Sequence, residues 1–134
     1  MKSSLIDTDI LSLFFRKHTK IVDSFSSYLL QYKKLNFSII TYYEIVSGLK
    51  HRDANKQISQ FLEFASKNIV LPLTEKSATI SGEIYAELRK DGKPLDDIDL
   101  LIAGVAISNN MVLVTRNTHH FERIKILEVE NWTK

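Results

Sequence analysis

Short runs rich in apolar residues alternate along the chain with longer stretches whose apolar positions recur at a helical period. The short runs, which we expect to be strands, are Ser4–Ile6, Asn36–Ile40, Asn68–Leu73, Met111–Thr115 and Lys125–Val129. Strands separated by helices are joined by crossovers, which favour parallel pairing with helices on both faces of the sheet. The pattern therefore predicts an α/β fold around a mostly parallel sheet.

The stretches between these runs predict helices with recognisable starts and ends. Thr41 can cap one helix, with Glu44 three residues later in a capping-box pattern. Thr74 can cap a long helix that runs to about Arg89, and Asp91-Gly92 is suited to end it. The other expected helices are Ile10–Lys17, Ile21–Lys33, Ala54–Ser66, Asp97–Asn109 and a single turn at His119–Arg123.

Composition narrows the class of protein. The 134 residues fit one domain over 1–134, and the absence of cysteine excludes a disulfide scaffold or a thiolate zinc site. Asp7 and Asp9 interrupt the apolar N-terminal run, and no run reaches the ~18 apolar residues of a membrane span. We therefore expect a cytoplasmic protein without membrane attachment. A net charge of +2 permits a nucleic-acid partner but does not require one.

Polar residues follow the predicted strands at the points where ligands bind in parallel sheets. Asp7 follows the first strand, Thr41 and Glu44 follow the second, and Arg116-Asn117 follows Met111–Thr115. Each acid also has a structural interpretation, because Asp7 or Asp9 can cap the first helix and Glu44 can complete a capping box. Position alone leaves both interpretations open for Asp7 and Glu44.

Asp99 is harder to explain as a structural residue. On the helix Asp97–Asn109 it shares one face with Ile102, Ala103, Ala106 and Ile107. A carboxylate on the face that packs against a sheet is costly unless it is paired or binds a metal. Its neighbours Asp96 and Asp97 are explained more simply, since acids in a first helical turn complement the helix dipole.

Carboxylates gathered at one edge raise one another's pKa and call for a compensating cation. Oxygen ligands without cysteine favour Mg²⁺ or Mn²⁺ over zinc, and such ions activate water and hold phosphodiesters. The four glycines form neither GxGxxG nor a P-loop, and no GxSxG is present. Arg116 and Arg123 flank the same edge, where binding phosphates and facing solvent are equally open. The adjacent His119 and His120 diverge, so they are not expected to share one ion.

These motifs, in this order, resemble the PIN-domain ribonucleases, most closely the toxins of VapBC toxin–antitoxin pairs. The matching segments are LIDTDIL (5–11), TYYEIVSGL (41–49), PLDDIDLLIAGVAI (94–107), VLVTRNTHHFERI (112–124) and ENW (130–132). Together they span nearly the whole chain. The resemblance implies a PIN-like three-layer α/β/α sandwich with a central parallel sheet of four to five strands.

The resemblance also implies an endoribonuclease, a hydrolase of RNA phosphodiester bonds that uses Mg²⁺ or Mn²⁺. Asp7 and Asp99, joined by Glu44, would be its catalytic metal ligands. Expected supporting residues are Thr8, Thr115 and Asn117, and expected RNA contacts are Arg116, His120 and Arg123. The implied partners are RNA, with tRNA or rRNA as the substrate, a VapB-like antitoxin and a second copy of the chain in a homodimer.

One departure from the family pattern concerns the fourth acid that PIN domains often carry after the strand that ends at Thr115. Here the segment reads Asn117-Thr118-His119-His120-Phe121, and His120 stands where an acid often precedes the phenylalanine. Asp97 could compensate, so one-metal and two-metal sites both remain open. The departure also keeps open a catalytically weak or inactive PIN-fold module that binds RNA. A PIN nuclease of RNA maturation is a further alternative.

Overall fold

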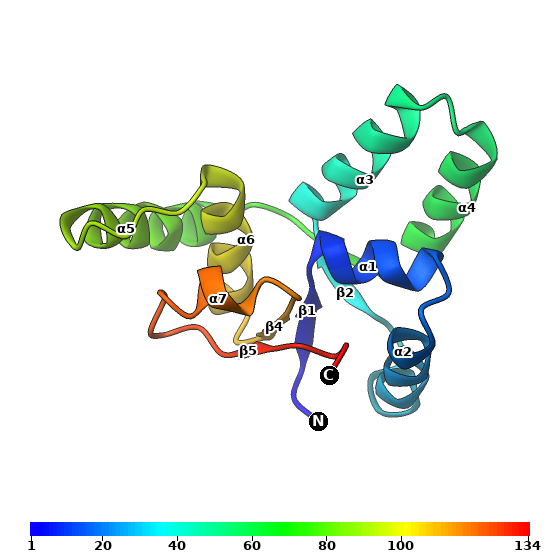
Figure 1. The fold of residues 1–134 in the computed structure, drawn as a ribbon, viewed down its shortest axis with the longest axis horizontal. Helices are drawn as coiled ribbons and strands as arrows, with labels where there is room; N and C mark the ends of the chain where they lie inside the picture. The colour runs from blue at the N-terminus through cyan, green and yellow to red at the C-terminus, as the bar shows by residue number, and fades with distance from the viewer.

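A five-stranded parallel sheet forms the centre of the molecule, which a computed structural model describes over residues 1–134 (Figure 1). The strands are ordered β3-β2-β1-β4-β5, and every neighbouring pair is parallel. This confirms the expected parallel sheet of four to five strands. The strands are β1 (Ser4–Ile6), β2 (Asn36–Ser38), β3 (Ile69–Leu71), β4 (Val112–Val114) and β5 (Val129–Glu130).

Seven helices connect the strands, and every predicted helix is present, with bounds within two residues of those expected except for the start of α3. Two helices join each of the first three pairs of consecutive strands. None of the helices is long and apolar enough to cross a membrane. The helices are α1 (Thr8–Phe15), α2 (Thr19–Tyr32), α3 (Ile39–His51), α4 (Asn55–Ser66), α5 (Glu75–Lys90), α6 (Asp97–Ser108) and α7 (Thr118–Phe121).

Two hydrophobic cores lie on opposite faces of the sheet, because successive strand residues point to opposite sides. Leu5 of β1 and Leu113 of β4 pack with residues of α5 and α6. Their neighbours Ile6 and Val114 pack with residues of α1, α2 and α4. In Figure 1 the first helical layer lies to the left of β1 and the second to its right. The predicted three-layer α/β/α sandwich is confirmed.

Helix α3 begins earlier than the sequence pattern predicts, and the predicted capping box is wrong. Ser38, at the end of β2, is the N-cap, and its hydroxyl accepts a hydrogen bond from the Thr41 N–H at 3.1 Å. This cap lies three residues upstream of the predicted one, so Thr41 is a fully buried helical residue. Glu44 therefore does not cap the helix, and its carboxylate is free for another role.

The last strand is also shorter and later than predicted. The pattern predicts a strand at Lys125–Val129, whereas β5 comprises only Val129–Glu130. Turns follow α7 over residues 122–126, and Ile124 and Leu127 pack into the core beside α5 and α6. These apolar residues anchor a loop, which explains why their pattern suggests a strand.

Helices α5 and α6 approach each other closely at Gly104. Ser81 of α5 donates a hydrogen bond to the carbonyl of Leu100 at 2.7 Å, which fastens the two helices together. A Cβ atom on residue 104 would overlap the Ser81 hydroxyl and the Ser77 carbonyl. Glycine is therefore required there by the close approach, and this contact fixes the position of α6.

Replacing Gly104 with alanine should lower the free energy of unfolding by about 2 kcal/mol, because the added carbon must push α5 away from α6. Denaturant unfolding measures this change. Gly82→Ala on α5 is the matched control, since a Cβ there meets nothing within 4 Å. That change should be neutral or stabilise by up to about 1 kcal/mol. Equal effects of the two substitutions would contradict the close-packing explanation.

Candidate active site

Asp7 occupies the carboxyl end of the central strand β1, where it caps helix α1. Its Oδ1 accepts a hydrogen bond from the Thr8 N–H at 2.8 Å, and its Oδ2 accepts one from the Thr115 hydroxyl at 2.8 Å. Only 7% of the residue is exposed. Asp7 is thus both a helix cap and a buried carboxylate held between the ends of β1 and β4.

The pKa of Asp7 is raised to about 7, mainly by burial, and the nearby charges of Asp9 and Asp99 contribute to this increase. The hydrogen bonds from Thr115 and Thr8 act in the opposite sense but do not outweigh burial. The carboxyl group of Asp7 therefore carries a proton for part of the time at neutral pH. A cation bound beside Asp7 would stabilise its ionised form.

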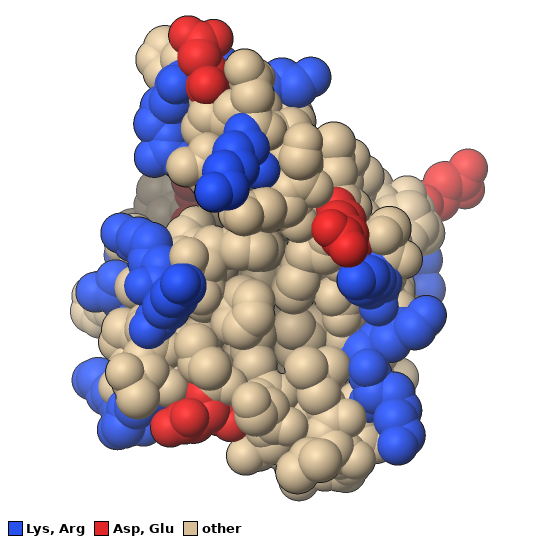
Figure 2. All heavy atoms as spheres, turned by 90° about the vertical axis from the view of Figure 1, so that its right-hand side faces the viewer, with Lys and Arg blue, Asp and Glu red and all other residues tan.

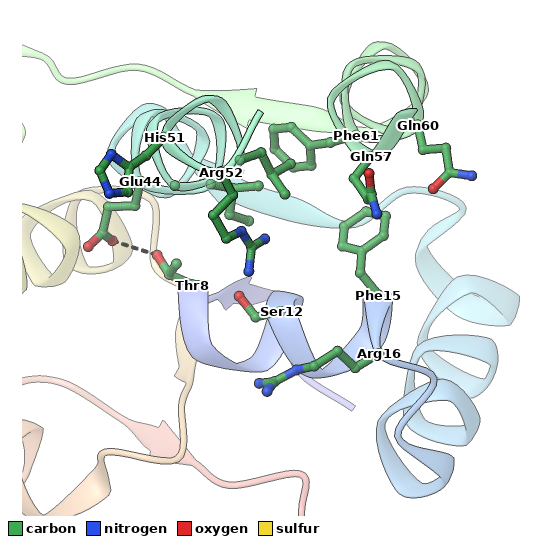
Figure 3. Close-up of a pocket in the computed structure, with 13 residues that line it drawn as sticks. Thr8, Ser12, Phe15, Arg16, Glu44, His51, Arg52, Gln57, Gln60 and Phe61 are labelled. Carbon is green, nitrogen blue, oxygen red and sulfur yellow. Dashed lines mark hydrogen bonds between the residues drawn. The ribbon is translucent and has the colours of Figure 1, made fainter. Parts of the chain in front are cut away.

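Glu44 reaches the same edge from helix α3, where it meets the first helix. The Thr8 hydroxyl donates a hydrogen bond to Glu44 Oε1 at 2.6 Å and lies 3.0 Å from the Thr41 hydroxyl (Figure 3). The pair Thr8–Glu44 joins α1 to α3 and fixes the direction of the carboxylate. This contact was not predicted, since the two residues lie 36 positions apart.

Asp99 reaches this edge from the opposite helical layer. As predicted, Ile102, Ala103 and Ala106 are buried on its helical face, and the Asp99 side chain is 22% exposed. Burial raises its pKa, the neighbouring charge of Asp96 adds to that effect, and Glu44 contributes in the same direction. The charge of Asp99 thus acts on Asp7, and that of Glu44 acts on Asp99, although the three acids come from separate parts of the fold.

Asn117 and His120 complete the edge near Asp99. The Asn117 N–H donates to the Thr115 hydroxyl oxygen at 3.0 Å, and its side-chain nitrogen lies 2.8 Å from His120 Nδ1. His120 Nδ1 lies 3.9 Å from Asp99 Oδ2 and lowers the pKa of that carboxyl. The residue at the position of the missing fourth acid therefore contacts the predicted ligand Asp99.

Asp9 contributes more to the site than its prediction as a helix cap suggests. Its Oδ1 accepts from the Ile10 N–H at 2.7 Å, and its Oδ2 accepts from the Arg116 N–H at 3.0 Å. Asp9 therefore ties the turn after β4 to the start of α1. Burial raises its pKa, and its charge in turn raises the pKa of Asp7.

Three residues that the sequence predicts as a metal ligand or RNA contacts lie further from the three central acids. Asp97 is exposed, and the main causes of the raised pKa values of Asp7 and Asp99 are burial and other charges. Arg123 donates to the Pro94 carbonyl at 2.9 Å, so it holds the loop before α6. The Arg116 side chain is exposed, and its charge lowers the pKa of Asp9.

No Lys or Arg forms an ion pair with the acids at this edge, and Arg116 acts on Asp9 only through its charge. The ion pairs of the protein are Lys2–Glu128, Lys67–Glu63 and the long His120–Asp99 contact. Uncompensated carboxylates with raised pKa values fit a hard divalent cation by donor chemistry and by charge. No three Asp, Glu or His side chains converge closely enough in this structure to form a preassembled ligand set. The fit therefore rests on charge and ligand type.

Comparisons with known proteins agree on one family. The family model of the PIN domain matches residues 4–127. Ribonuclease VapC1 of Haemophilus influenzae (strain R2866) is 33% identical over 131 residues, which cover 97% of this chain and 98% of that protein. The tRNA(fMet)-specific endonuclease VapC of Shigella flexneri is 35% identical over 101 residues, or 75% of this chain and 76% of that protein.

Solved structures show the same similarity. A chain of DNA-bound VapBC from Salmonella typhimurium superposes with a TM-score of 0.86 and 30% identity, over 98% of this chain and 99% of that one. A chain of VapBC2 from Rickettsia felis, bound to a promoter DNA fragment, superposes with a TM-score of 0.85 and 29% identity, over 96% of this chain and 98% of that one.

The raised pKa of Asp7 predicts how stability depends on pH in the absence of divalent metal. The folded state holds the Asp7 proton more tightly than the unfolded chain, so this group stabilises the fold most below pH 3.8. That contribution is lost as the pH rises through about 7. Asp7→Asn removes the charge and keeps the side-chain oxygen that accepts from the Thr8 N–H, so it should be more stable than wild type at pH 8, by up to about 4 kcal/mol.

Denaturant unfolding in EDTA at pH 5 and pH 8 measures this difference, and the advantage of Asp7→Asn should shrink at the lower pH. Asp23→Asn, on the exposed side of α2, is the control. An advantage of Asp7→Asn that is the same at both pH values would contradict the burial of a titrating Asp7.

Proposed function

The chain belongs to the PIN-domain family, and we propose that it is the endoribonuclease toxin of a VapBC-type toxin–antitoxin pair. It hydrolyses RNA phosphodiester bonds with Mg²⁺ or Mn²⁺ as the cofactor. The observation that carries this proposal is the group of uncompensated carboxylates at the carboxyl end of the central strand. The names of its relatives support RNA as the substrate.

Asp7, Glu44 and Asp99 would hold the divalent cation. When bound, that cation supplies Lewis-acid chemistry, which neutralises charge on a phosphate and makes water a better nucleophile at neutral pH. Hydroxyl groups orient two of the carboxylates, because Thr115 donates to Asp7 and Thr8 donates to Glu44. Residues that fix a ligand in this way support both metal affinity and activity.

The proposal requires three carboxylates and does not depend on Asp97, which is exposed. His120 supports Asp99 from the position of the missing fourth acid, and Asn117 holds the His120 ring. This arrangement favours a single principal cation. The three acids themselves are all present, which favours an active nuclease over an inactive binding module.

The partners follow from the relatives. Solved VapBC complexes support a VapB-like antitoxin that blocks the site, and they favour a toxin over a nuclease of RNA maturation. The Shigella flexneri relative, named as tRNA(fMet)-specific, supports a structured RNA such as tRNA as the substrate. Action on cellular RNA is consistent with the cytoplasm, and a homodimer remains part of the proposal.

Asp99→Asn should lower the rate of RNA cleavage by more than about a hundredfold. Mutating a residue that only supports a metal ligand already lowers metal affinity or activity about ten- to a hundredfold, and loss of a ligand itself should have a larger effect. The assay is cleavage of total tRNA in Mg²⁺ and in Mn²⁺, with circular dichroism to show that the variant folds. The matched control is Asp96→Asn, an exposed acid at the start of the same helix whose side chain makes no capping bond.

The control should cut within about threefold of wild type, because an exposed acid that binds no metal affects Asp99 only through screened charge. Full activity of Asp99→Asn would show that Asp99 is not a metal ligand. Cleavage by the wild-type protein that is undiminished in EDTA would contradict the metal-dependent mechanism.

A further inference from the structure

A groove of about 650 Å³ runs between α1, α3 and α4, with the carboxylate of Glu44 and the hydroxyl of Thr8 at one end (Figure 3). Its inner wall is apolar and includes Ile45, Leu49 and the buried ring of Phe61. The groove is therefore continuous with the proposed catalytic edge. A polymer cut at that edge has a path along α1 and α4.

Positive charge lines this groove without a partner. Arg16 at the end of α1 and Arg52 at the end of α3 are both exposed, and Arg52 extends toward Ser12 (Figure 3). Neither guanidinium takes part in an ion pair or side-chain hydrogen bond of the protein. Glu44 is the only acid among the lining residues. Arginine binds phosphate oxygens through two parallel hydrogen bonds, so these side chains suit a phosphate backbone.

The surrounding surface has the same sign of charge. Lys and Arg occupy nine positions between 16 and 67 (16, 17, 20, 33, 34, 50, 52, 56 and 67), against four for Asp and Glu (23, 44, 53 and 63). The face seen from the side of α2 and α4 shows many more blue than red side chains (Figure 2). The net charge of +2 for the whole chain thus conceals a basic face beside the acidic edge.

Side chains suited to bases lie on the α4 side of the groove. Gln57 and Gln60 are exposed one helical turn apart, so they share a face, and both line the groove. Each side-chain amide offers a donor and an acceptor, and neither is engaged within the protein. Phe15 is 38% exposed beside them, with its ring edge-on to Phe61. Amides and an aromatic ring are the groups that read unstacked RNA bases.

We propose that this groove is the subsite for single-stranded nucleotides that flank the scissile phosphate of the RNA. Arg16 and Arg52 hold the phosphate backbone, and Gln57 and Gln60 select the base that lies against Phe15. Single-stranded RNA fits because a duplex keeps its base faces stacked, out of reach of these side chains. This inference rests on the proposed ribonuclease function and adds the residues that choose the cleavage site.

The backbone contacts are tested by binding of a short single-stranded RNA that spans a mapped cleavage site, in the non-cleaving Asp99→Asn protein. Arg16→Ala and Arg52→Ala should each weaken binding about tenfold, as expected for a lost charge-assisted contact. Each should also reduce the slope of log affinity against log salt by about 0.7. Lys90→Ala, which removes one exposed charge from α5, is the control and should change affinity less than about twofold.

Base selection is tested in the active protein by sequencing RNA ends after cleavage of total RNA. The double variant Gln57→Ala with Gln60→Ala should relax the base preference next to the cut while cleavage of poorly preferred sites continues at the wild-type rate. Gln31→Ala on α2, outside the groove, should leave the preference unchanged. An unchanged preference in the double variant would overturn the assignment of these glutamines.

The outcomes separate the inference from the function beneath it. A wild-type protein that cuts no RNA would refute the proposed function. If the wild-type protein cuts RNA but Arg16→Ala and Arg52→Ala bind RNA as tightly as Lys90→Ala does, the assignment of the groove as an RNA subsite is refuted and the proposed function stands. Arginine variants that keep RNA binding but lose the cognate antitoxin would show a protein-docking groove, which also overturns the inference.

Discussion

Negative charge concentrated at the end of the central strand is the constraint on which the rest of the molecule depends. Asp7 is buried with a pKa of about 7, an increase to which the charges of Asp9 and Asp99 contribute. Two hydroxyls and one N–H partly compensate the carboxylates of Asp7 and Glu44, but no Lys or Arg pairs with either. A fold that retains such costly charges is poised to bind a cation, and strongly perturbed carboxylates gathered in this way are typical of functional sites.

The topology explains how distant residues share this edge. The chain leaves β1 toward β2 and β3 on one side and returns to β4 and β5 on the other, so β1 lies where the strand order reverses. Asp7 directly follows β1, Glu44 comes from the helix after β2, and Asp99 from the helix before β4. Gly104 lets α6 pack closely on α5, and this packing fixes the position of the helix that carries Asp99. The groove beside Glu44 lies between α1, α3 and α4, so helix α3 contributes both to the proposed metal site and to the groove.

Sequence reasoning located Asp7 and Asp99 because both depend on local rules. Asp7 follows a short apolar strand, and the period of α6 places Asp99 on a buried face. The sequence pattern left Glu44 open between a capping-box residue and a metal ligand, and the capping alternative fails because Ser38, a residue at the strand end, caps the helix instead. The Thr8–Glu44 bond and the Asp9–Arg116 contact join residues far apart in the chain, and no periodic pattern encodes such contacts. The displaced β5 shows the same limit, since loop anchors and strand residues are equally apolar.

Calorimetric titration of the metal-free protein with Mn²⁺ at pH 7, in buffers of different ionisation enthalpy, tests the central claim most directly. Since Asp7 has a pKa of about 7, binding of one ion should release about half a proton. Asp7→Asn should remove that release, and Glu44→Gln and Asp99→Asn should weaken binding. No binding at millimolar Mn²⁺, or equal binding by wild type and all three variants, would contradict the account.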